Sequence, residues 1–234
     1  MIKAILFDLD GTLLPMDQEL FLKAYFGGLV KAMVPHGYDP DRVVKSIWDG
    51  TGAMITNNGK QTNEEVFWAS FCAQFGPDAR KDEPLFDAFY RTEFQKVQNV
   101  CGFEPQAAEA IRQIKDMGYR TILATNPLFP PIATQSRIRW AGLNVEDFEW
   151  VTTYDNSGFC KPNPDYYREI LSKRGLKPEE CAKVGNDVGE DMIAETLGMR
   201  VFLLTPCLIN KTGTDISCYP NGGFPELLEF VRSL

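Results

Sequence analysis

Residues 5–12 read ILFDLDGT, an apolar run that ends abruptly in two aspartates, a glycine and a threonine. This run predicts a short buried strand with carboxylates at its carboxyl end. Because side chains alternate along a strand, Asp8 and Asp10 point to the same side. Two carboxylates at one site raise each other's pKa, so we expect a divalent cation with the oxygen ligands that Mg²⁺ prefers. Gly11 permits a sharp turn and a close approach of backbone amides to a ligand, and Thr12 adds a hydroxyl beside them.

The composition is typical of a folded protein. Its 234 residues, of which 44% are hydrophobic and 12% aromatic, are enough for one large core and a smaller second unit. The net charge of −8 argues against non-specific binding of nucleic acid, which needs basic patches for phosphate contacts. No apolar run is long enough to span a membrane, so we expect no membrane association.

Cysteine and histidine form no recognisable metal or catalytic pattern. The six cysteines include no CxxC pair, and no secretory signal precedes the first strand. Both observations predict reduced thiols in a cytoplasmic protein. The single histidine, His36, lies in a Pro-His-Gly turn, where we expect it on the surface, so histidine-based catalysis is not expected.

Later apolar segments, each closing on a polar or small residue, predict further buried strands. These strands are expected at 120–126, 150–155, 182–187 and 201–205. Helical spacing predicts core helices at 105–117, 132–141, 164–174, 190–197 and 225–233. Strands that alternate with helices imply parallel strands joined by right-handed crossovers. The sequence therefore predicts an α/β fold with a doubly wound, Rossmann-like parallel sheet, which binds ligands at the carboxyl ends of its strands.

The gap between the first and second predicted strands is far longer than one crossover. Its apolar positions recur every three to four residues and predict an inserted bundle of helices at 18–34, 40–48, 63–75 and 84–97. We expect a core of residues 1–14 and 101–234 and a helical insert of residues 15–100. Asn63 is the expected N-cap of the third inserted helix. Residues 49–60, rich in glycine and asparagine, are either a substrate-facing loop or a solvated connection.

Polar groups follow the predicted strands where the strands end. Thr125 and Asn126 follow the second strand and can bind phosphate oxygens. Lys161 stands just before a predicted helix, and its ammonium can balance negative charge. Asp187 and Asp191 follow the fourth strand, where they either cap a helix or complete a metal site. Because all of these strand ends belong to one edge of the sheet, we expect one site.

These residues, taken in order, resemble the four motifs of the haloacid dehalogenase superfamily. The matching segments are Asp8-Leu9-Asp10-Gly11-Thr12, Thr125, Lys161-Pro162, and Gly185-Asn186-Asp187 with Asp191. The helical insert resembles the type-1 cap of that superfamily. The resemblance implies Mg²⁺-dependent hydrolysis of a small phosphomonoester, with Asp8 as the nucleophile that forms an aspartyl-phosphate and Asp10 as general acid and then base. It also implies that the phosphoryl group binds to Gly11, Thr12, Thr125, Asn126 and Lys161.

One departure from the family pattern concerns the metal. Many members have an aspartate directly after the glycine of the fourth motif, where this chain has Asn186. The resemblance then assigns Mg²⁺ to Asp8, Asp10 and Asp187, with Asp10 binding through its backbone carbonyl. Asp191 is expected as a further ligand or as an acid acting through water, and Asn186 as the fallback contact.

Two other functions stay open at this point. A phosphomutase would use the same aspartate pair but let a hydroxyl of a sugar phosphate accept the phosphoryl group. A non-catalytic protein that binds phosphate or metal would keep these groups without turnover. The expected partner is a small phosphorylated metabolite, and the sequence leaves open whether the chain is a monomer or a homodimer.

The insert also carries candidate substrate contacts. Its aromatic side chains either line a pocket for an organic leaving group or pack in the core, and core packing is the expectation because their spacing fits a buried helical face. These side chains are Trp48, Phe67, Trp68, Phe71 and Phe75. Asn57, Asn58 and Lys60 are expected to be exposed near the substrate, and changing Lys60 is expected to alter substrate affinity.

Overall fold

The computed structural model describes all 234 residues and is built around a six-stranded sheet. Neighbouring strands are parallel throughout, in the order β3-β2-β1-β4-β5-β6. The strands are β1 (Ala4–Phe7), β2 (Arg120–Leu123), β3 (Trp150–Val151), β4 (Cys181–Gly185), β5 (Arg200–Leu204) and β6 (Asn221–Gly222). The chain adds β2 and β3 on one side of β1 and the later strands on the other. The predicted doubly wound parallel sheet is therefore confirmed.

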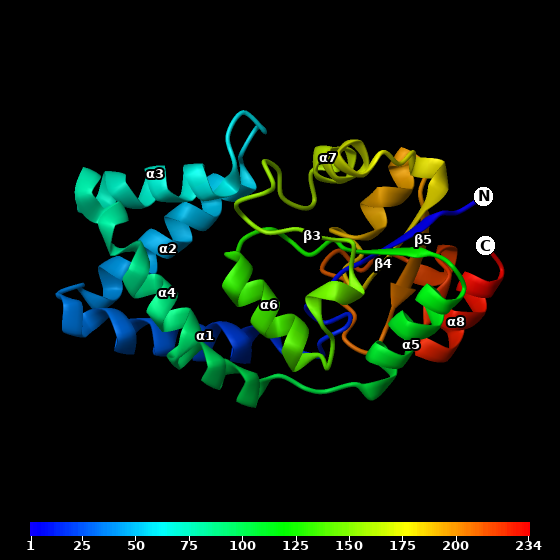
Figure 1. The fold of residues 1–234 in the computed structure, drawn as a ribbon, viewed down its shortest axis with the longest axis horizontal. Helices are drawn as coiled ribbons and strands as arrows, with labels where there is room; N and C mark the ends of the chain where they lie inside the picture. The colour runs from blue at the N-terminus through cyan, green and yellow to red at the C-terminus, as the bar shows by residue number, and fades with distance from the viewer.

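Helices cover both faces of this sheet. They are α5 (Pro105–Asp116), α6 (Pro131–Trp140), α7 (Pro164–Arg174) and α8 (Phe224–Arg232). Ile5 and Phe7 of β1 belong to an apolar cluster that includes residues of α5, α6 and α8. Ala4 and Leu6 belong to a second cluster, which includes residues of α7. Because alternate residues of one strand serve opposite faces, both faces are buried, with α7 on one side of the strands and α5 and α8 on the other (Figure 1).

Between β1 and α5 the chain forms helices and no strand. They are α1 (Gln18–Met33), η1 (Val34–His36), α2 (Pro40–Ile55), α3 (Asn63–Phe75), η2 (Pro77–Asp82), α4 (Glu83–Arg91) and η3 (Glu93–Val100), where η marks a 3₁₀-helix. They lie at the end of the molecule opposite both termini (Figure 1). His36 is exposed, as predicted. None of the helices is both long and apolar enough to cross a lipid bilayer.

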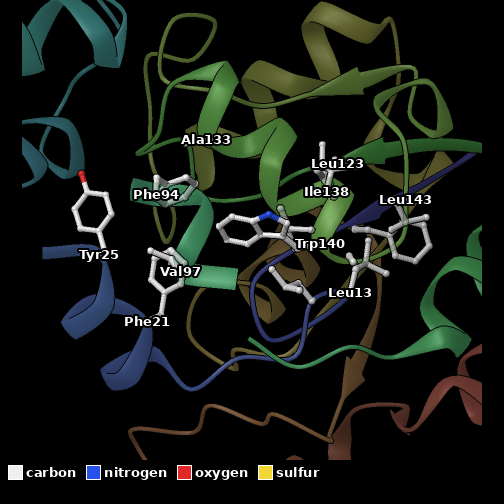
Figure 2. Close-up of a cluster of buried hydrophobic side chains, with 14 of the residues drawn as sticks. Leu13, Phe21, Tyr25, Phe94, Val97, Leu123, Ala133, Ile138, Trp140 and Leu143 are labelled. Atoms are coloured by element: carbon white, nitrogen blue, oxygen red, sulfur yellow. The ribbon is translucent and has the colours of Figure 1, made fainter. Parts of the chain in front are cut away.

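A continuous apolar cluster joins the insert to the core. Figure 2 shows Phe21 and Tyr25 of α1 beside Phe94 and Val97 of η3, next to Trp140 of α6. The ring centroids of Phe94 and Trp140 are 5.1 Å apart across this junction. The insert therefore packs on the core through shared aromatic side chains, and not only through its two chain connections.

The expected loss of helix over residues 49–60 is wrong for residues 49–55, because α2 continues to Ile55, and is confirmed for residues 56–60. Gly50 is buried where α2 crosses α3, and a Cβ there would lie 2.6 Å from the ring of Phe67. This glycine therefore permits close packing of two helices and does not mark a turn. The connection between α2 and α3 is therefore limited to residues 56–62.

The N-cap expected at Asn63 is also wrong. Thr62 caps α3, since its hydroxyl accepts from the Glu65 amide while the Glu65 carboxylate accepts from the Thr62 amide. Asn63 is instead fully buried, donates to the Pro127 carbonyl oxygen at 3.2 Å and accepts from Asn57 Nδ2 at 2.9 Å. Asn57 is buried as well, contrary to expectation. These hydrogen bonds tie the loop to the core.

Several boundaries also differ from the prediction. The helix expected at 190–197 is a 3₁₀-helix, η6 (Met192–Leu197), and the helix expected at 84–97 is split at Thr92. The strand β6 has no apolar pattern and forms only by backbone pairing with β5 at the sheet edge. The remaining short helices are η4 (Val145–Asp147), η5 (Pro178–Glu180) and η7 (Ile216–Cys218).

Candidate active site

The polar strand ends meet at one edge of the sheet. Phe7, the last residue of β1, pairs with Leu123 of β2 and with Val184 of β4. The residues that follow these three strands are therefore nearly level with one another, and they include Asp8, Thr125 and Asn186. The strands follow the order β1-β2-β3 on one side of β1 and β1-β4-β5-β6 on the other, so the strand order reverses at β1. Open α/β sheets bind ligands at such a point.

A buried lysine connects two of the predicted carboxylates. The side chain of Lys161 is 1% exposed, and its Nζ lies 2.7 Å from Asp8 Oδ1 and 2.8 Å from Asp191 Oδ1. Lys183 of β4 is fully buried and lies 3.1 Å from the same Asp191 oxygen. Asp191 is therefore shared by two ammonium groups. Lys183 is not among the residues singled out from the sequence, although a lysine inside a strand expected to be buried on both faces is a signal that could have revealed it.

Charge pairing decides the ionisation of this cluster. Burial alone would lower the pKa of Lys161, but the carboxylates of Asp191 and Asp8 outweigh it and hold this pKa well above its ordinary value. Burial alone would raise the pKa of Asp191, but Lys161 and Lys183 outweigh it and lower this pKa to about 2. For Lys183 burial prevails and lowers the pKa to about 8. Lys161 therefore faces Asp8 as a permanent cation.

Three oxygen groups meet on the other side of Asp8. Thr12 Oγ1 lies 3.1 Å from Asp8 Oδ2 and 3.0 Å from Asn186 Oδ1. The Asn186 amide is fixed in this orientation because its Nδ2 donates to the carbonyl oxygen of Cys207. Gly11 makes room for it, since its φ is +82° and a Cβ there would lie 2.3 Å from Asn186 Nδ2.

The Asp187 side chain closes the turn after β4. Its Oδ1 accepts from the backbone amides of Gly189 and Glu190, and its own amide donates to Asp191 Oδ2. No three His, Cys, Asp or Glu side chains of the chain are grouped closely enough to hold a metal ion by themselves. A cation at this site therefore needs amide, hydroxyl, water or substrate oxygens in addition to carboxylates.

Asp10 has a partner that is not among the residues singled out from the sequence. Arg137 of α6, whose side chain is 1% exposed, forms an ion pair with Asp10 Oδ2 and lies 4.4 Å above the ring of Phe129. Asp10 Oδ1 is buried without a hydrogen-bond partner. Burial raises the pKa of Asp10, and Arg137 acts against this rise. Nothing in the sequence distinguishes Arg137 from the exposed Arg139 on the same helix.

Hydrogen bonds hold Thr125 and Asn126 at the end of β2. The Thr125 carbonyl oxygen accepts from the Tyr166 hydroxyl at 2.8 Å. Asn126 Oδ1 accepts from the Lys161 amide at 3.2 Å, and Nδ2 donates to Glu190. The second strand end is therefore connected directly to the lysine segment, as a common site requires.

A cavity of about 310 Å³ extends from these groups to the insert. Its polar end includes Asp8, Asp10, Thr125, Asn126, Asn186, Asp187, Glu190 and Asp191. One face of α1 lines it with Gln18, Phe21, Leu22, Tyr25 and Phe26. One face of α2 lines it with Ile47, Trp48, Thr51, Met54 and Ile55. Both sets follow helical spacing, so two amphipathic helices form the walls opposite the sheet.

The insert residues singled out from the sequence divide into two groups. Phe67 and Trp68 are buried in the apolar cluster, as expected, and also line the cavity. Trp48 lines the cavity and is 49% exposed, so the expected core packing is wrong for this residue alone. Phe71 is buried in the apolar cluster and Phe75 packs against it, as expected. None of Asn57, Asn58 and Lys60 lines the cavity.

The chain is similar to proteins of one hydrolase family. The family model for haloacid dehalogenase-like hydrolases matches residues 2–194. A glyceraldehyde 3-phosphate phosphatase from Methanothermobacter thermautotrophicus is 25% identical over 229 residues, which cover 93% of this chain and 95% of the relative. A phosphoglycolate phosphatase from Vibrio parahaemolyticus is 26% identical, covering 87% and 84%. A solved 2-haloacid dehalogenase from Pseudomonas syringae has the same fold, with a TM-score of 0.63 at 19% identity over 100% of this chain and 99% of that one.

Proposed function

We propose that this chain, which belongs to the haloacid dehalogenase-like hydrolase family and is a phosphatase, hydrolyses small phosphomonoesters with Mg²⁺ through an aspartyl-phosphate on Asp8. One observation carries the proposal. Asp8, ion-paired with Lys161, and Asp10, with an unpartnered Oδ1, line the same cavity. A nucleophile, a balancing cation and a proton carrier are therefore present together.

In the first step an Asp8 carboxylate oxygen bonds to phosphorus while the bond between phosphorus and the leaving oxygen breaks. Lys161 fixes the orientation of Asp8 through its 2.7 Å contact and balances charge on the transferring phosphoryl group. Asp191 in turn fixes Lys161 from the opposite side, at 2.8 Å. Removal of Asp8 therefore eliminates bond formation itself, whereas removal of Asp191 affects geometry.

Asp10 carries the proton in both steps. Its carboxyl lines the cavity, its Oδ1 has no hydrogen-bond partner in the protein, and burial raises its pKa toward the protonated form. After giving this proton to the leaving alkoxide, Asp10 takes a proton from the water that attacks the aspartyl-phosphate. Phosphate is released and the Asp8 carboxylate is restored.

The oxygen groups beside Asp8 fit a hard divalent cation. Asp8, the backbone carbonyl of Asp10 and the Oδ1 of Asn186 would hold Mg²⁺, which usually takes one or two carboxylates together with waters and substrate oxygens. We assign the fourth-motif contact to Asn186 and not to Asp187, because Asn186 Oδ1 and Asp8 Oδ2 lie 3.0 and 3.1 Å from the same Thr12 Oγ1, whereas Asp187 Oδ1 accepts from two amides of its own turn. When bound, Mg²⁺ offsets the repulsion between an anionic nucleophile and an anionic substrate.

The remaining phosphoryl contacts come from groups at the same strand ends. Thr12 would present its hydroxyl, and Thr125 and Asn126 would hold further phosphoryl oxygens. The amides of Gly11 and Thr12 donate to the carbonyl oxygens of Leu14 and Leu9, so Gly11 contributes through the shape of the turn. We assign the insert, residues 15–100, as a cap over the leaving group, on a core of residues 1–14 and 101–234. The cavity walls contributed by α1 and α2 support this assignment.

The test is phosphate release from a panel of small phosphomonoesters, with Mg²⁺ and with EDTA. We expect release only with Mg²⁺, and a loss of at least about a thousandfold in the Asp8→Asn variant. The exposed Asp165→Asn serves as a matched control and should retain full activity. Isomer formation without phosphate release would show a phosphomutase instead. Folded protein that binds inorganic phosphate without turnover would overturn the enzymatic assignment.

A further inference from the structure

We propose that the substrates of this chain are phosphomonoesters whose leaving group is neutral and mainly apolar, such as an aromatic alcohol. The inference rests on the proposed function and adds the chemistry of the group released. It comes from the part of the cavity that lies beyond the catalytic aspartates, toward the insert.

The walls of this part are aromatic. Phe21 and Tyr25 of α1, Phe67 and Trp68 of α3, and Phe86 and Tyr90 of α4 all line the cavity. Five of these rings are at most 7% exposed and the sixth, Phe67, is 9% exposed. A hydrated, polyhydroxylated leaving group would have to give up its water here with few hydrogen bonds in return. An aromatic or aliphatic leaving group would instead gain apolar burial, at about 25 cal/mol per Å².

The cavity contains no cation for a second anionic group. No Lys, Arg or His is among the residues that line it, whereas Asp8, Asp10, Asp187, Glu190 and Asp191 all are. The buried cations nearby are already paired, Lys161 with Asp8 and Asp191, and Arg137 with Asp10. A carboxylate or a second phosphate on the leaving group would therefore be buried without a counter-ion.

The polar groups of the wall are neutral, and one has no partner. Trp68 Nε1 is buried without a hydrogen-bond partner. The indole N–H also faces Tyr154, whose pKa it lowers against the rise that burial causes. The hydroxyls of Tyr25 and Tyr90 are 3.2 Å apart, and since one hydrogen suffices for their mutual bond, the other is available. These donors suit an ether, carbonyl or hydroxyl oxygen on the leaving group.

An apolar surface leads into the cavity from outside. Trp48 and Ile55 line it from α2 and remain 49% and 46% exposed. They are seven residues apart and so share one helical face. The volume of about 310 Å³ lies at the small end of ligand sites, which suits one ring and a phosphoryl group.

The first experiment compares kcat/KM with Mg²⁺ for benzyl phosphate, 4-carboxybenzyl phosphate and phosphoglycolate. The two benzyl esters differ by one carboxylate and keep a similar leaving alcohol. We expect benzyl phosphate to be preferred at least about tenfold over each anionic ester, because the carboxylate would be buried unpaired. Equal or better use of 4-carboxybenzyl phosphate would overturn the inference and leave the proposed function intact.

A cavity variant tests the same point from the side of the protein. Thr51 is half-buried on α2, and its hydroxyl donates to the Ile47 carbonyl oxygen at 2.9 Å within the helix. Thr51→Lys should raise kcat/KM for 4-carboxybenzyl phosphate relative to benzyl phosphate at least about tenfold, because the ammonium supplies the missing counter-ion. Thr51→Val is the matched control and should keep the wild-type ratio. An unchanged ratio in Thr51→Lys would count against the assigned location of the leaving group.

Binding without turnover separates the two proposals. Calorimetric titration with benzylphosphonate should show binding at least about tenfold tighter than with phosphonoacetate, which carries a carboxylate. Tighter binding of phosphonoacetate would overturn the inference even if phosphate release is seen. No release from any ester by folded protein would overturn the proposed function, and the inference with it.

Discussion

The guanidinium of Arg137 on α6 forms an ion pair with one oxygen of Asp10, while the other oxygen of the same carboxyl is buried without a partner. The pair joins two segments that are far apart in the chain. It leaves Asp10 with one oxygen fixed by the protein and one without a hydrogen-bond partner in it. Arg137 is therefore a positioning residue for the proposed proton carrier.

Replacing Arg137 should impair both folding and catalysis. Arg137→Met leaves Asp10, whose side chain is 24% exposed, without its counter-ion, and should lower the free energy of unfolding by about 2 kcal/mol. We expect kcat/KM to fall at least about tenfold because the carboxyl loses its fixed orientation. Arg137 acts to lower the pKa of Asp10, so its loss should move the alkaline limb of the kcat/KM profile to higher pH. The exposed Arg139→Met is the control, and an unmoved limb with full activity in Arg137→Met would contradict this role.

Lys183 should make stability depend on pH in the alkaline range. Burial lowers its pKa in the folded protein to about 8, below its ordinary value of 10.5. Between these values the unfolded chain binds more protons, so the contribution of this lysine to stability increases as pH rises from 8 to 10.5. At 1.36 kcal/mol per pKa unit the full increase is about 3 kcal/mol.

The measurement is the free energy of unfolding of wild type and Lys183→Met in urea at several pH values. The difference between them should grow in favour of the wild type from pH 8 to 10.5. The exposed Lys211→Met is the control, for which the difference should stay constant. A constant difference for Lys183→Met would show that Lys183 stays charged across this range.

Two glycines of α2 should respond in opposite ways to the same substitution. A Cβ at Gly50 would lie 2.6 Å from the Phe67 ring, whereas a Cβ at Gly52 would meet no atom within 4 Å. Gly50→Ala should destabilise the protein by about 1–3 kcal/mol through overpacking. Gly52→Ala should stabilise it by about 0.5–1 kcal/mol, because alanine loses less entropy in a helix. Thermal unfolding of both variants checks the prediction, and stabilisation by Gly50→Ala would mean that α2 and α3 can move apart freely.

The hydrogen bonds of Asn63 should hold the loop before α3 in place against the core. Asn63→Ala removes the hydrogen bonds to Pro127 and Asn57 and should cost about 2 kcal/mol of stability. It should also speed hydrogen exchange at the amides of residues 63 and 64, which donate to Ser157 and Tyr154 of the core. The exposed Asn58→Ala should change neither quantity. Unchanged exchange in Asn63→Ala would indicate that the backbone bonds hold the loop by themselves.

The fold could be predicted from the sequence because strand and helix periodicity are local properties. The run ILFDLDGT places a buried strand before polar groups, and the same pattern recurs at the ends of β2 and β4. Parallel strands then bring those ends to one edge without further information. Errors arose where a local pattern had a tertiary cause, as for Gly50, which resembles a helix breaker but permits two helices to pack closely.

The site could be predicted only in part, because sequence patterns are local and most contacts of the site are not. The sequence by itself determined that Asp8, Asp10, Lys161 and Asp191 come from converging strand ends, because their positions follow from strand and turn boundaries. Only the tertiary structure decided that Arg137 pairs with Asp10 and that Asn186, not Asp187, faces Thr12. It also decided that the cavity wall is aromatic and has no cation. Periodicity along the chain fixes which face a residue occupies, whereas ion pairs and hydrogen bonds depend on distances of about 3 Å between separate elements, which packing alone sets.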